Sequence, residues 1–160
     1  MRKEKTKRYN QVKDLVRWAM SYHARMAKQY GDAAEEASSE RVKMALNYLA
    51  NRELRMQTGL EDIFHDGTDH TEVLETWFDE VGDFPHPPKL ERIAETANYD
   101  SIDAIMETAV TEHSTLQDLY QHRASRANVN PEKEFFNSLA EGHEAEMRRI
   151  VTSLEELEDI

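Results

Sequence analysis

The sequence predicts an all-α protein built from four long helices, and three observations support this. Apolar residues recur at three- and four-residue steps in four segments of the 160-residue chain, which is the periodicity of amphipathic helices. The 5 glycines and 4 prolines are few, and three of the prolines fall within residues 85–88. Two short connections and one long one separate the segments, which predicts two antiparallel hairpins in a single domain, residues 1–160.

The first two helices form the first predicted hairpin. The first is expected at residues 10–30, because its apolar stripe ends at Tyr30 and Gly31 follows where a helix would end. The second is expected to begin after Ser38 or Ser39, either of which can cap it. It should end near His65.

The other two helices form the second hairpin. Asp100 or Ser101 is expected to cap the third helix, which should fade between residues 126 and 128. The sequence Asn130-Pro131-Glu132 indicates the start of the fourth, with a capping Asn, Pro at the first helical position and an acid near the helix dipole. This helix runs to the C-terminal residues.

A crossover of residues 66–100 joins the hairpins. Its length favours a topology in which the second and third helices run in the same direction, because the connection must then travel the length of the molecule. One short helix is expected after Asp69, with Val73, Leu74, Trp77, Phe78 and Val81 on its apolar face, and residues 84–88 should break it. Its aromatic residues either pack on the helices or form a dimer contact.

Composition excludes several functions. No cysteine is present, so disulfides, iron–sulfur clusters, thiolate zinc sites and cysteine nucleophiles are excluded. A formal net charge of −12 disfavours nucleic-acid binding, which depends on Lys and Arg. The basic tail of residues 1–9 is expected to be a solvated terminus. No apolar run is long enough for a membrane span, and a cytoplasmic location is expected.

Cofactors with recognisable sequence signals are not expected either. The chain has no Gly-rich phosphate loop, which argues against a nucleotide cofactor. Six of the seven methionines lie at or beside apolar stripe positions, where Met is adaptable packing rather than a haem ligand.

Each apolar stripe is interrupted near mid-helix by an ionisable residue. These residues are His23, Glu53, Glu112 and His143, and Glu146 lies one turn beyond His143. An unpaired charge in an apolar core costs several kcal/mol, so the interruptions are expected to meet in the interior. His113 points about 100° away from its neighbour Glu112 around the helix and is expected to be lateral or exposed.

The four helix patterns resemble the ferritin-like superfamily, and rubrerythrin in particular, over nearly the whole chain. That family carries a Glu and, seven residues later, a Tyr on its first helix, Glu-x-x-His on its second, a Glu on its third and Glu-x-x-His on its fourth. Glu53 and Glu112 match the second- and third-helix acids, and Tyr30 and Tyr120 stand where rubrerythrin has tyrosines. The resemblance therefore implies a metal site in the interior of a four-helix bundle.

The ligand set departs from the family pattern. His23 stands in place of the first-helix Glu, Met56 replaces the second-helix His, and the fourth-helix order is reversed, from His143 to Glu146. A thioether is a poor ligand for iron, so the resemblance does not carry a complete two-iron site to this chain.

Two functions remain open. In the first, the residues His23, Glu53, Glu112, His143 and Glu146 bind one or two divalent ions of Fe, Mn or Zn, and the family implies oxygen- or peroxide-linked iron oxidation. In the second, the same residues form a metal-free polar network in a helical module that acts through protein–protein contacts. No catalytic residue is assigned, and a homodimer through one hairpin face is expected.

Overall fold

The computed structural model describes residues 11–65, 70–78 and 88–159. These residues form six helices and no β-strand, which confirms the all-α prediction. The helices are α1 (Val12–Glu36), α2 (Glu40–His65), α3 (Thr71–Leu74), α4 (Pro88–Thr96), α5 (Ile102–Arg126) and α6 (Asn130–Glu158).

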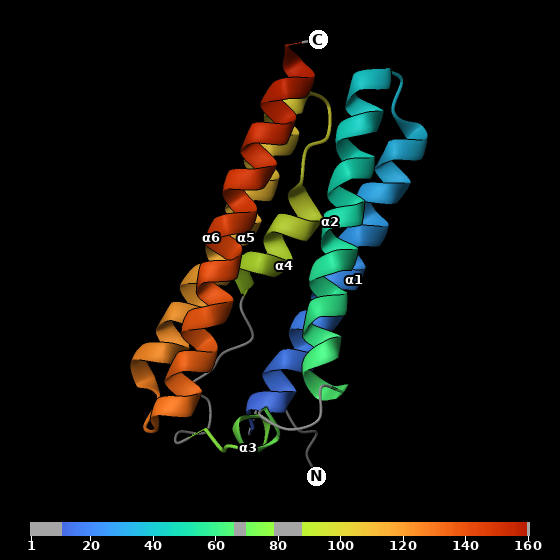
Figure 1. The fold of residues 1–160 in the computed structure, drawn as a ribbon. Coiled ribbons are helices and arrows are strands. Elements are labelled where there is room, and N and C mark those ends of the chain that lie inside the picture. Colours follow the sequence, from blue (N-terminus) through green and yellow to red (C-terminus); the bar gives the residue numbers. More distant parts are fainter. Residues whose placement is uncertain (1–10, 66–69, 79–87, 160) are drawn as a thin grey trace.

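Four long helices, α1, α2, α5 and α6, lie side by side (Figure 1). The α1 helix packs mainly on α2, and α5 packs mainly on α6, as two antiparallel hairpins. Both α2 and α5 run from the top to the bottom of Figure 1, so the chain between them must return along the molecule. This is the parallel arrangement that the long crossover favours.

The short helix of the crossover is shorter than predicted. The α3 helix ends at Leu74, and Trp77 lies beyond it with 64% of its surface exposed. Trp77 pairs with Gln11 in an isolated antiparallel bridge, because the chain here turns to bind the start of α1. Phe78 does pack inward, with the guanidinium of Arg123 4.1 Å from its ring centre. Val81 lies outside the described residues.

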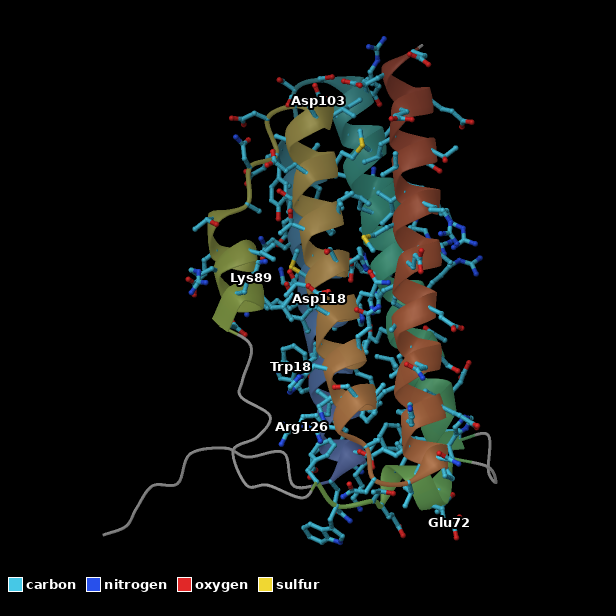
Figure 2. All side chains as sticks on the ribbon, turned by 90° about the vertical axis from the view of Figure 1, so that its left-hand side faces the viewer. Trp18, Glu72, Lys89, Asp103, Asp118 and Arg126 are labelled. Atoms are coloured by element: carbon cyan, nitrogen blue, oxygen red, sulfur yellow. The ribbon has the colours of Figure 1, made fainter. Side chains whose placement is uncertain are left out.

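A second short helix, α4, was not predicted. Leu90 and Ala94 of α4 are buried, and Ile93 packs beside them, at the three- and four-residue steps of a helix that begins at a proline. The hydroxyl of Tyr22 donates a hydrogen bond to the Leu90 carbonyl at 3.1 Å. Figure 2 shows α4, marked by Lys89, on the flank of the long helices. The prolines at residues 85–88 indicated a break in helical structure, so the start of a helix at the last of them was not predicted.

The helix ends agree with the predicted caps to within one residue, except in α1. Ser39 Oγ accepts a hydrogen bond from the Val42 amide, and Ser101 Oγ accepts one from the Ala104 amide. The α6 helix begins at Asn130 itself, so the cap position is one residue earlier than predicted, at Val129.

The prediction that Gly31 ends the first helix is wrong. The α1 helix continues to Glu36, and Ala34 on the next turn is buried. Glycine inside a helix costs only about 1 kcal/mol relative to alanine. Burial of one further turn against the neighbouring helix outweighs that cost, and the helix therefore passes through the glycine.

Replacement of Gly31 by alanine tests this account. An added Cβ at Gly31 meets no described atom within 4 Å. We expect Gly31→Ala to raise the free energy of unfolding by up to about 1 kcal/mol, because alanine has the higher helix propensity. Urea denaturation measures the change. Glu35→Ala, an exposed position one turn further along the same helix, is the control and should change stability by less than about 0.5 kcal/mol. A clear loss of stability in Gly31→Ala would contradict a regular helix at this position.

Candidate metal centre

Six ionisable side chains are buried together in the middle of the long helices. None of them has more than 3% of its surface exposed. The α1 and α2 helices contribute one each, and α5 and α6 contribute two each. The six are His23, Glu53, Glu112, His113, His143 and Glu146. All five predicted site residues are therefore buried, and they are joined by His113, which was not predicted to be interior.

Glu53 is the centre of this polar group. Its Oε1 lies 2.6 Å from His23 Nδ1, and its Oε2 lies 3.1 Å from His113 Nε2. Burial alone would raise the pKa of Glu53, but His113 and His23 lower it below its usual value through their charges and hydrogen bonds. Glu53 is therefore an ionised carboxylate held between two imidazoles.

Glu112 is the second buried carboxyl group beside it. The Tyr30 hydroxyl donates a hydrogen bond to Glu112 Oε1 at 3.0 Å. Burial and the negative charge of Glu53 raise the pKa of Glu112 well above its usual value. Beside an ionised Glu53, this shift favours the protonated, neutral form of Glu112.

Three of these side chains converge on one point. His23, Glu53 and Glu112 each offer one ligand atom, and these atoms lie within 4.8 Å of one another. His23 Nε2 is buried and has no hydrogen-bond partner among the described residues. Among the same described residues, the hydrogen-bond partner of Glu112 Oε2 is limited to the adjacent Glu53 carboxyl group. The group therefore retains one ligand atom, His23 Nε2, that no described side chain satisfies.

The expectation that His113 is lateral or exposed is wrong. Its side chain is fully buried, and its Nδ1 lies 2.9 Å from His143 Nδ1. His113 stands four residues after buried Ala109 and three before buried Leu116, so it shares their face. The apolar stripe of α5 is wide enough to include two adjacent residues. The spacing to Ala109 and Leu116 was the signal that would have found it.

His143 lies in the same polar layer but outside the converging group. It contacts His113, and its ring stacks at 5.6 Å on that of Tyr120. Burial and the neighbouring imidazoles hold the pKa of His143 well below its usual value. His143 is therefore a neutral partner of His113 and does not belong to the converging group of His23, Glu53 and Glu112.

Glu146 is already occupied by arginines. Its carboxylate accepts two hydrogen bonds from Arg52, at 2.7 and 2.8 Å, and a third from Arg149 at 3.1 Å. Burial alone would raise the pKa of Glu146, but the hydrogen bonds and charge of Arg52 lower it. A carboxylate bound in this way has little capacity left for a metal ion.

No protein-family model, curated protein or solved structure matches the chain. The ferritin-like resemblance, the homodimer and the cytoplasmic location therefore stay predictions. Within the part of the chain that the structure describes, no helix is both long and apolar enough to cross a membrane.

The ion pair of Glu146 and Arg52 predicts a pH-dependent stability. Because the folded-state pKa of Glu146 is lowered, its contribution is complete above the unfolded pKa of about 4.5 and is lost as the pH falls through the folded value. We expect Glu146→Gln to lower the free energy of unfolding by about 1–3 kcal/mol at neutral pH. The difference from the parent protein should shrink below about pH 4.5.

Denaturation of both proteins between about pH 3 and pH 7 measures this effect. Glu144→Gln is the matched control, because Glu144 is exposed and pairs with Arg148 on the same helix. It should cost no more than about 0.5 kcal/mol. An equal cost for the two substitutions would show that the interior ion pair has no special role in stability.

Proposed function

We propose that the chain is a ferritin-like four-helix bundle that binds one divalent metal ion in its interior through His23, Glu53 and Glu112. The observation that carries the proposal is the convergence of these three buried side chains, each with a ligand atom within 4.8 Å of the others. They come from α1, α2 and α5, so both hairpins contribute to the same group.

The charges of the group support a cation. Glu53 and Glu112 lie side by side in the buried interior, and the raised pKa of Glu112 reflects both its burial and the repulsion between them. A divalent ion would offset both carboxylates and displace the proton of Glu112. One imidazole with two carboxylates suits Fe(II), Mn(II) or Zn(II), since all three bind nitrogen and oxygen donors.

The donor set fits one ion better than two. A second ion of the ferritin-like kind would need a His at the position of Met56 and a free carboxylate on α6. Met56 offers only a thioether, and the Glu146 carboxylate already accepts three hydrogen bonds from arginines. We therefore do not extend the proposal to a two-iron oxidase.

The neighbouring residues would position the ligands. His113 donates to Glu53 and fixes the carboxylate from the side of α5, while the Tyr30 hydroxyl fixes Glu112. Hydrogen bonds of this kind orient metal ligands and tune their basicity. A bound ion would supply Lewis acidity at this position and, if it were iron or manganese, a change of oxidation state.

Metal uptake tests the proposal directly. The protein is incubated with Fe(II) or Mn(II) in the absence of air, freed of unbound metal, and analysed for its elements. We expect about one ion per chain in the parent protein. Glu112→Gln should lose most of this metal, because it removes a charged ligand while keeping the size of the side chain.

Glu146→Gln is the matched control, since it neutralises an equally buried carboxylate outside the converging group. This variant should keep its metal. Metal loss in both variants would point to general damage rather than a site. An absence of metal in the folded parent protein would refute the proposal.

A metal-free polar core is the alternative, and one observation favours it. Both oxygens of Glu53 already bind imidazole nitrogens, so the network satisfies much of its own hydrogen bonding. The chain would then be a helical module that acts through protein–protein contacts.

Thermal unfolding separates the two functions. A metal that binds only the folded state at about one hundred times its dissociation constant adds about 2.7 kcal/mol of stability. We expect Mn(II) to raise the unfolding temperature and a chelator to reverse the rise. A temperature unchanged by either addition would favour the metal-free core.

A further inference from the structure

A cavity of about 270 Å³ lies between α2 and α6 and leads from the surface to the polar layer. Its outer residues, among them Gly59 and Gly142, are exposed. Its inner residues include Tyr120, His143 and His23, which are buried. The cavity therefore connects solvent with the interior side chains of the candidate site.

Two glycines face this cavity, one from each helix. An added Cβ at Gly59 or Gly142 meets no described atom within 4 Å. Glycine in a helix interior has an energetic cost, and here no close contact with a described chain segment requires it. The absence of side chains at these two positions keeps the space between α2 and α6 free.

The wall of the cavity is mostly apolar. Met56 and Leu60 come from α2, and Leu139 comes from α6. Methionine adapts its shape readily to different bound groups. Arg55, which is exposed, is the one Lys, Arg, Asp or Glu side chain among the lining residues, so the cavity favours an uncharged molecule with an apolar body.

One of the buried residues that line the cavity, Tyr120, has an unsatisfied hydroxyl group. Tyr120 has 1% of its surface exposed, and its hydroxyl has no hydrogen-bond partner within the described ranges of the chain. A buried polar group without a partner is rare in folded proteins and calls for an explanation. A ligand with one hydroxyl or carbonyl group at its end would satisfy Tyr120.

We propose that this cavity binds a small neutral molecule that has an apolar body and a single hydrogen-bonding group directed at Tyr120. A cavity of about 150 Å³ accommodates benzene, so the space here suits a molecule of roughly ten non-hydrogen atoms. The proposal does not depend on the metal ion. A molecule in the cavity would nevertheless lie next to His23, which both lines the cavity and belongs to the converging group.

The test is a titration of the ¹⁵N-labelled protein, as purified, with p-cresol and with toluene, which share an apolar ring and differ in the hydroxyl group. We expect saturable chemical-shift changes at the amides of Gly59, Gly142 and their neighbours. Tyr120→Phe should weaken p-cresol binding by about fivefold, the value of one hydrogen bond, and leave toluene binding unchanged. An equal effect on both probes, or none on p-cresol, would overturn the role of Tyr120.

Closing the cavity provides the second arm. Gly142→Leu should fill the entrance and weaken both probes by about tenfold or more. Gly31→Leu is the matched control, a helical glycine on α1 that also has open space around it and does not line the cavity. Unchanged binding in Gly142→Leu, or no saturable shifts in the parent protein, would overturn the proposal. Neither result would bear on metal uptake, which is measured separately.

Discussion

The buried carboxylate of Glu53 is the constraint on which the interior depends. An ionised group in a core costs several kcal/mol unless hydrogen bonds and opposite charges compensate it. Compensation comes from both hairpins, because His23 lies on α1 and His113 lies on α5. Arg52 of α2 and Glu146 of α6 make a second polar link between the hairpins. Apolar packing is tolerant of small shifts, whereas these bonds fix how one hairpin stands against the other.

The same constraint sets the chemistry of the site. Burial and the negative charge of Glu53 raise the pKa of Glu112. The ionised form of Glu112 is therefore favoured only when a cation lies beside it. Glu146 does not take part in this balance, because its carboxylate already accepts hydrogen bonds from Arg52 and Arg149. In the metal-free network the imidazoles offset the charge of Glu53 and a proton neutralises Glu112, whereas in the proposed metal site one ion would offset both carboxylates.

Helical periodicity in the sequence predicted the long elements, but it missed features that depend on packing. Periodicity located the four long helices and the interior residues of each stripe. It misjudged Gly31, because the end of α1 is decided by burial of Ala34 rather than by propensity. It misplaced His113, because a stripe two residues wide looks like a narrow one when each position is judged alone. The arginine partners of Glu146 come from another helix and from the next turn, so no single stripe indicated them.

Met56 connects the two proposals. On the ferritin-like assignment, this α2 position would carry an imidazole ligand, and the chain instead has a thioether that lines the cavity. On that assignment, methionine at this position would remove a donor that a second metal needs and would add apolar wall to the space beside the proposed ion. The glycines at 59 and 142 extend that space to the surface. If both proposals hold, the interior has room for an apolar molecule beside a single metal ion in place of a second metal position.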